Sequence, residues 1–144
     1  MTTNPITDKA LSYVGLSWCR NALPPDGIDS FGLVRAILRD CFGKETPSPV
    51  TWDPAWTSKE PSLERFCQDN LIRTSQATPG TVLLFHHDKA PGQFGRTIPK
   101  TLGIYLPNNR MVVAYWARAC TIAKVSPWWT TRLHSIWSFP QHDT

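Results

Sequence analysis

The hydrophobic pattern of this chain changes its period near residue 80, and that change limits the folds that the chain can adopt. Before this point, apolar residues recur three or four positions apart, which is the spacing of one helix face. After it, short apolar runs lie between turn signals, as strands do. Helices followed by strands predict an α+β domain, with N-terminal helices packed on a C-terminal antiparallel sheet of five to six strands. The 144 residues fit one domain, residues 1–144.

Two amphipathic helices are expected in addition to a central apolar one. The first covers residues 5–15 with Thr7 as its cap, and its apolar face is formed by Ala10, Leu11 and Val14. The last covers residues 61–75, and its inward side chains are Leu63, Phe66, Cys67 and Leu71.

The central helix is expected to begin at Ser30 and to end at Gly43. Arg35 and Arg39 are expected to lie away from its apolar stripe. Its apolar residues recur at helical spacing and are Phe31, Val34, Ile37, Leu38 and Cys41. A segment rich in proline and tryptophan follows, at about residues 44–61, and it is expected to form an ordered loop or extended arm.

Five β-type runs complete the chain, with a compact hairpin turn at Pro107–Asn109 between the second and the third. The runs are residues 81–85, 101–106, 110–116, 120–125 and 133–139.

Composition argues against several classes of function. The net charge is +4, but the basic residues are scattered singly, so nucleic-acid binding is not expected. The four cysteines form no close pair, so neither a metal site nor a cofactor is expected. No secretory signal precedes the cysteines, and reduced, mostly buried thiols in a protein made in the cytosol are expected. No apolar run approaches the roughly 20 residues that would span a bilayer.

Ser30 is the residue on which a functional interpretation depends, because it lies where a loop containing Gly27 and Asp29 enters the central helix. A serine at this place can be a helix cap, a nucleophile, or the remnant of one.

The chain resembles the NlpC-type cysteine peptidases, which have a papain-like fold. The family pattern places G-x-D-C-x-G-L-V at a buried helix, then P-G-D-x-x-x-F, then H-x-G-I-Y-L followed by H-A. The matching residues are Gly27, Asp29, Gly32, Leu33, Val34, Pro79, Gly80, Phe85, Gly103, Ile104, Tyr105, Leu106 and Ala114. Gly15 and Trp18 stand where the family has a glycine and a residue that lines the site.

A narrower resemblance is to the small peptidase-like proteins of phage tails and gene-transfer-agent-like particles. It rests on "GLVRAILRDCFG", on the arm "PSPVTWDPAW" and on the ending "VSPWWTTRLHSIWSFP". This resemblance implies a virion component of the tail tip or baseplate. Its partners would be the hub, the distal tail protein and a central fibre or receptor-binding protein, and peptidoglycan stem peptide would be a ligand or former substrate.

The catalytic residues of the family are all replaced in this chain. The resemblance puts the nucleophilic cysteine at Ser30, the general base at Thr101 and the orienting residue at Val113. A serine needs an adjacent base to attack an amide, and neither threonine nor valine can supply one. The resemblance therefore implies an inactive relative of peptidoglycan endopeptidases, and it favours a helix-capping role for Ser30.

An active or peptidoglycan-binding hydrolase that assists genome entry is the alternative. In it, Ser30 would be served by a displaced base, His86 or His87, at the end of the first strand. The competing interpretation is a solvated histidine pair. His134 and His142 have no evident partner.

Four tryptophans are candidates for partner contacts, because aromatic residues are enriched at protein interfaces. They are Trp52, Trp56, Trp128 and Trp129. The alternative is that they fill the core of a small domain.

Overall fold

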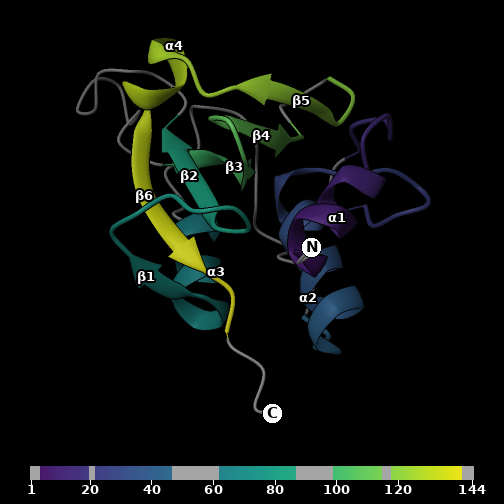
Figure 1. Ribbon diagram of the computed structural model, residues 1–144. Helices are drawn as coiled ribbons and strands as arrows, with labels where there is room; N and C mark the ends of the chain where they lie inside the picture. The colour runs from purple at the N-terminus through teal and green to yellow at the C-terminus, as the bar shows by residue number, and fades with distance from the viewer. Residues whose placement is uncertain (1–3, 20–21, 47–61, 87–98, 115–117, 141–144) are drawn as a thin grey trace.

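The computed structural model describes residues 4–19, 22–46, 62–86, 99–114 and 118–140. Helices come first and the strands of one sheet follow, which confirms the predicted α+β class (Figure 1). The helices are α1 (Pro5–Ser12), α2 (Ser30–Phe42), α3 (Ser62–Asn70) and α4 (Pro127–Thr130). The strands are β1 (Ile72–Thr74), β2 (Val82–His86), β3 (Pro99–Leu106), β4 (Arg110–Val113), β5 (Thr121–Lys124) and β6 (Leu133–Ser138).

The strands form one six-stranded sheet in the order β1-β6-β2-β3-β4-β5, and the pairs are antiparallel. The predicted hairpin turn between β3 and β4 is confirmed, since Leu106 pairs with Arg110. Asn108 and Asn109 in this turn have φ values of 67° and 57°. Asparagine tolerates this left-handed conformation better than most residues, which explains the tight connection.

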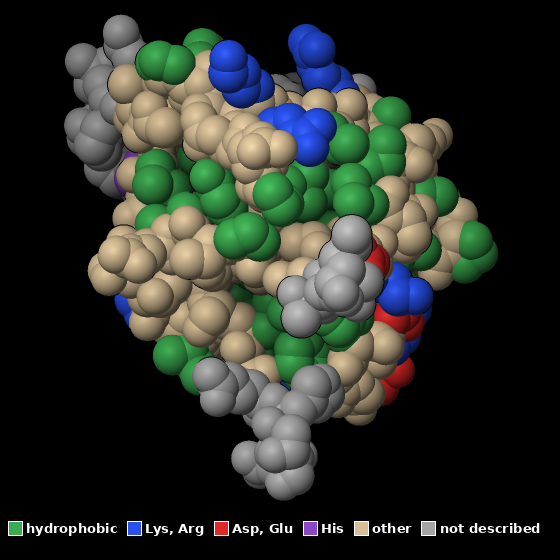
Figure 2. All heavy atoms as spheres, viewed as in Figure 1, with side chains coloured by type: hydrophobic (Ala, Val, Ile, Leu, Met, Phe, Trp, Pro, Cys, Tyr) green, Lys and Arg blue, Asp and Glu red, His purple; other side chains and the backbone are tan. Residues whose placement is uncertain are grey.

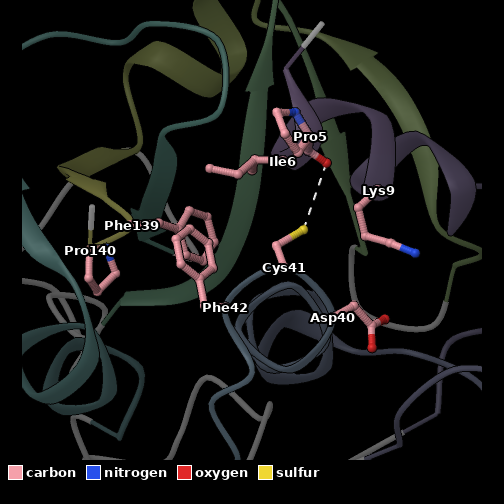
Figure 3. Close-up of a pocket in the computed structure, with 8 residues that line it drawn as sticks. All are labelled: Pro5, Ile6, Lys9, Asp40, Cys41, Phe42, Phe139 and Pro140. Carbon is pink, nitrogen blue, oxygen red and sulfur yellow. Dashed lines mark hydrogen bonds between the residues drawn. The ribbon is translucent and has the colours of Figure 1, made fainter. Parts of the chain in front are cut away.

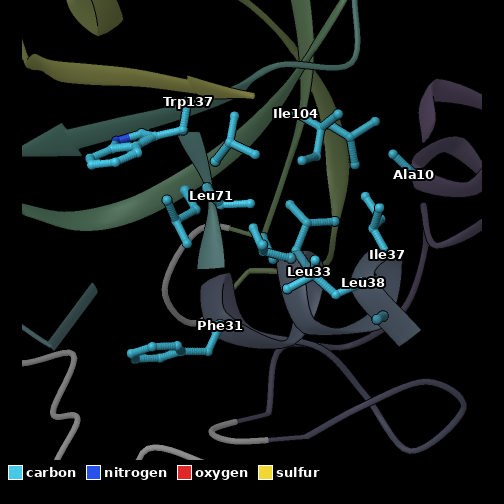
Figure 4. Close-up of a cluster of buried hydrophobic side chains, with 14 of the residues drawn as sticks. Ala10, Phe31, Leu33, Ile37, Leu38, Leu71, Ile104 and Trp137 are labelled. Carbon is cyan, nitrogen blue, oxygen red and sulfur yellow. The ribbon is translucent and has the colours of Figure 1, made fainter. Parts of the chain in front are cut away.

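Helix α2 is the centre of the core, as its apolar stripe predicts (Figure 4). Its C-terminal cap is Gly43, at a φ of 65°, so both predicted ends of this helix are confirmed. Phe31 meets Phe66 of α3 edge to face, at 5.2 Å between ring centroids. The prediction for Arg35 was wrong: it is buried, and its guanidinium donates to the hydroxyl and carbonyl oxygens of Thr46.

Helix α1 differs from its prediction in its cap and in its buried face. Asn4 is the cap, accepting hydrogen bonds from Ile6 N and Thr7 N, and Thr7 lies inside the helix. Ala10 is buried, but Leu11 and Val14 are 41% and 40% exposed. The helix ends one turn earlier than predicted and therefore buries a narrower face.

Helix α3 buries the residues that its period predicts, although it ends at Asn70. The next residues form β1 instead of continuing the helix, and they pair with the end of β6. Strand β1 was missed because its three residues extend an amphipathic pattern that fits a helix equally well.

The two faces of the sheet carry separate apolar clusters. The cluster on the helix side includes Val82, Leu84, Leu102 and Ile104 together with α2. The cluster on the other side consists of Leu83, Phe85, Met111, Val113 and Val125. Within the described ranges, no helix is long and apolar enough to cross a membrane.

Gly32 provides a test of how closely the loop before α2 packs on this helix. A Cβ at position 32 would lie 2.2 Å from the carbonyl oxygen of Ala22. Replacing a helical glycine by alanine ordinarily stabilises a protein by about 0.5–1 kcal/mol. Because of the backbone clash, we expect Gly32→Ala instead to lower the free energy of unfolding by about 1–3 kcal/mol. Urea unfolding measures the difference, and a variant at least as stable as the parent would contradict this packing.

Candidate functional site

The N-terminus of α2 is capped by Asp29, not by Ser30. Asp29 is fully buried, and its Oδ1 accepts a hydrogen bond of 2.6 Å from Gly32 N. A buried carboxylate at this end also interacts favourably with the helix dipole. The prediction that Ser30 caps the helix was therefore wrong, because the preceding residue occupies that role.

The Ser30 hydroxyl instead joins α2 to two strands. Leu102 N–H donates to Ser30 Oγ at 3.2 Å, and Ser30 Oγ in turn donates to the carbonyl oxygen of Ala114 at 3.4 Å. The pairing of β3 with β4 ends where Gly103 faces Val113, so Leu102 and Ala114 are the next residues along the two strands. The hydroxyl thus relays a hydrogen bond between these backbone groups at the end of the ladder.

Thr101 and Val113, which the resemblance assigns to the base and orienting positions, are adjacent to this bridge. Thr101 precedes Leu102, Val113 precedes Ala114, and their exposed fractions are 4% and 1%. Val113 belongs to the apolar cluster on the sheet face away from the helices. Thr101 pairs with Phe85, a residue of the same cluster. The three positions therefore lie near one end of the β3–β4 pair, and their assignment as former catalytic positions stays a prediction.

Ser30 is poorly placed for nucleophilic attack. It is 3% exposed, and its hydroxyl hydrogen is directed at a backbone carbonyl. Among the described residues, the hydroxyl has no imidazole or carboxylate as a hydrogen-bond partner. A serine hydroxyl attacks an amide when a neighbouring base removes its proton. In the described arrangement, both hydrogen bonds of the hydroxyl are made with backbone groups.

Trp18 lies beside the start of α2, where the family has a residue that lines the site. It forms a parallel bridge with Ile28, which is two residues before Ser30. Two hydrogen bonds hold this crossing: Ile28 N donates to Ser17 O, and Cys19 N donates to Ile28 O. Trp18 is half-buried and packs against the main core, so its aromatic ring also has a structural role.

His86, the displaced base of the alternative, is directed toward β6. Its ring centroid lies 5.1 Å from that of His134, edge to face. In the sheet order, β2 separates β6 from β3, and the Ser30 bridge lies at the β3–β4 end. His86 itself lies on β2 and pairs with Pro99 of the neighbouring β3, but the described hydrogen bonds of Ser30 Oγ go to Leu102 N and Ala114 O. The described geometry does not bring His86 to Ser30.

His134, for which the sequence offers no partner, lies in a polar network. The indole N–H of Trp137 donates to Ser135 Oγ at 2.7 Å, and that oxygen lies 2.7 Å from His134 Nδ1. His134 Nε2 faces Glu64 Oε1 at 3.8 Å. Burial lowers the pKa of His134, and the Glu64 carboxylate partly opposes this effect. The network favours neutral His134, because Ser135 can then donate its hydrogen to Nδ1.

The predicted partner-binding tryptophans fall into different environments. Trp128 is 46% exposed, with the guanidinium of Arg132 over its ring at 3.6 Å. Trp129 packs against Phe85 at 4.8 Å and belongs to the cluster on the sheet face away from the helices. Trp52, Trp56, His87 and His142 lie outside the described residues.

The cysteines and acidic residues offer no metal centre in the described ranges. Cys19, Cys41, Cys67 and Cys120 are free thiols. Cys67 and Cys120 are buried, and burial raises the pKa of both, to about 11 for Cys120. These two thiols are inert packing groups at neutral pH.

Comparison with solved structures identifies the fold, whereas no sequence-family model and no curated protein sequence matches the chain. A protein similar to lipoproteins of the NLP/P60 family from Staphylococcus aureus is 21% identical, with a TM-score of 0.64. The match covers 95% of this chain and 41% of that protein, so the chain spans less than half of its length.

Two further structures match over nearly the whole of both chains. The NlpC/p60 domain of the peptidoglycan hydrolase SagA is 18% identical with a TM-score of 0.64, covering 95% of this chain and 100% of that domain. RipD from Mycobacterium tuberculosis, described as a non-catalytic NlpC/p60 protein adapted to peptidoglycan binding, is 15% identical with a TM-score of 0.55. That match covers 94% of this chain and 98% of RipD. The chain therefore has the fold of NlpC/P60 domains.

Proposed function

We propose that this protein is a catalytically inactive NlpC/P60-type domain that serves as a structural component of a phage-type tail tip. The observation that carries the first part is the state of Ser30, whose hydroxyl bridges Leu102 N and Ala114 O. Ser30, in the nucleophile position, holds the helix to the sheet through these hydrogen bonds. Thr101, in the base position, is not basic, and Val113, in the orienting position, is apolar.

The existence of RipD supports this interpretation, since an NlpC/p60 domain has lost catalysis there and taken on a binding function. Inactivity in this chain has a physical basis of its own. The three altered positions are each less than 5% exposed, so water and a peptide cannot reach them without rearrangement of the core. Restoring catalysis would require opening the β3–β4 end as well as replacing side chains.

The tail-tip role rests on the narrower sequence resemblance. In the proposal, the protein is made in the bacterial host cytoplasm and assembles into the virion beside the hub, the distal tail protein and a central fibre or receptor-binding protein. Trp128 and Leu133 are both exposed apolar side chains and supply surface suited to such contacts. Peptidoglycan stem peptide remains a second ligand in this proposal, as the fold of peptidoglycan-binding RipD supports.

The first prediction concerns chemistry at Ser30. The purified protein should not hydrolyse peptidoglycan stem peptides under conditions in which the SagA NlpC/p60 domain does. A fluorophosphonate probe should not label Ser30, because no base among its described partners activates the hydroxyl. Intact-mass and peptide mass spectrometry measure the labelling. Labelling that disappears in Ser30→Ala or in His86→Gln would show an active serine hydrolase and reject the proposal.

The second prediction compares two adjacent tryptophans in assembly. Trp128→Ala removes an exposed ring and its contact with Arg132, so it should cost the isolated domain less than about 1 kcal/mol of unfolding free energy. Incorporation into particles should nevertheless fall, because the ring is proposed to contact a neighbouring tail protein. Incorporation is measured on immunoblots of purified particles, as the amount of this protein relative to a major tail protein.

Trp129→Ala is the matched control, because Trp129 packs on Phe85. It should destabilise the isolated domain more than Trp128→Ala does, by about 1–3 kcal/mol, because this partly buried ring packs against the apolar cluster on that sheet face. Normal incorporation of the Trp128→Ala protein would contradict the proposed contact surface.

A further inference from the structure

A cavity lies at the opposite end of α2 from Ser30. It has a volume of about 640 Å³ and lies between α1, the last turn of α2 and the segment after β6 (Figure 3). Its lining consists of Pro5, Ile6, Lys9, Asp40, Cys41, Phe42, Phe139 and Pro140. In Figure 2, hydrophobic side chains gather in a hollow on this face of the molecule, and acidic and basic side chains lie to one side of it. The volume falls in the range of small-molecule sites.

One end of the cavity is aromatic. The rings of Phe42 and Phe139 stack with centroids 5.5 Å apart and planes inclined by 13°. Pro140 lies beside them, and Ile6 faces them from α1 (Figure 3). A flat apolar group could stack on this pair, because offset stacking is a favourable aromatic geometry.

The other end of the cavity carries one basic and one acidic side chain, Lys9 and Asp40. The Asp40 carboxylate is already bound by Arg39, at 2.7 and 3.1 Å, and by the hydroxyl of Tyr13 at 2.9 Å. Arg39 and Tyr13 hold the pKa of Asp40 below its ordinary value, so it is ionised. Lys9 forms no ion pair within the described residues. Because Arg39 and Tyr13 already bind the Asp40 oxygens, the Lys9 ammonium is left as the cation in the cavity lining that can receive an anionic group.

We propose that this cavity binds a small amphiphilic anion, with a planar apolar body on Phe42 and Phe139 and an anionic group at Lys9. Figure 3 shows Cys41 between these two ends, with its sulfur 3.8 Å from the carbonyl oxygen of Pro5. A bound ligand would therefore cover the thiol. The site is separate from the Ser30 bridge, and the inference does not depend on the proposed tail-tip role.

The test uses two dyes of nearly the same shape. 8-Anilinonaphthalene-1-sulfonate carries an anionic sulfonate, and N-phenyl-1-naphthylamine is its uncharged counterpart. We expect the anionic dye to bind the native protein with one-site saturation, measured by fluorescence titration. Lys9→Met keeps the apolar stem and removes the charge. It should therefore lower the affinity for the anionic dye by about two- to fivefold and leave the affinity for the neutral dye unchanged. Lys124→Met, on the exposed edge strand β5, is the matched control and should change the affinity for neither dye.

The location of the dye is tested by alkylation of Cys41 with iodoacetamide, followed by mass spectrometry. At ten times its dissociation constant, the anionic dye should slow alkylation of Cys41 about tenfold. Alkylation of exposed Cys19 should be unaffected. Circular dichroism and urea unfolding confirm that the variants are folded. The proposal is overturned if the anionic dye fails to bind, if Lys9→Met leaves its affinity unchanged or weakens both dyes equally, or if Cys41 stays unprotected.

Discussion

The hydroxyl group of Ser30 is the constraint on which this structure depends. It accepts a hydrogen bond from Leu102 N and donates one to Ala114 O, at the point where the pairing of β3 with β4 ends. These backbone groups are buried, and a buried group without a partner costs about 1–3 kcal/mol. One side chain thereby fixes the N-terminus of the central helix against strands β3 and β4. A thiol in its place would be a weaker donor and acceptor, and would serve this structural role less well.

Under the proposed function, the same bridge explains how a peptidase-type fold would persist without its chemistry. In an NlpC-type peptidase the start of this helix presents a cysteine thiolate to a base, and the helix dipole favours the anion. In this chain the dipole is matched by the buried Asp29 carboxylate, and the neighbouring side chains Thr101 and Val113 are themselves buried. Under the proposed function, packing that would surround an open cleft is instead part of the core. A cavity lined in part by Cys41 lies at the other end of the helix.

Much of the fold follows from local pattern, whereas the site does not. The stripe of α2 and Gly43 predict that helix because its period and its stop signal are both strong. Asp29 and Ser30 are both competent caps, so sequence alone cannot decide between them. The partners of Ser30 are 72 and 84 residues away in the sequence, and no local pattern reports contacts of that range. Arg35 was misplaced for the same reason, because its burial depends on Thr46 beyond the helix end.

The most direct test of the central claim is amide hydrogen exchange at Leu102 in the wild-type protein and in Ser30→Ala. Tyr105 N is the internal reference, since it donates to Thr81 O at 2.8 Å and does not involve Ser30. A structural hydroxyl predicts that Leu102 is protected in the wild type and exchanges at least about tenfold faster in Ser30→Ala, relative to Tyr105. Equal protection of Leu102 in the two proteins would contradict the account, because Ser30 would then not be holding the end of the β3–β4 ladder.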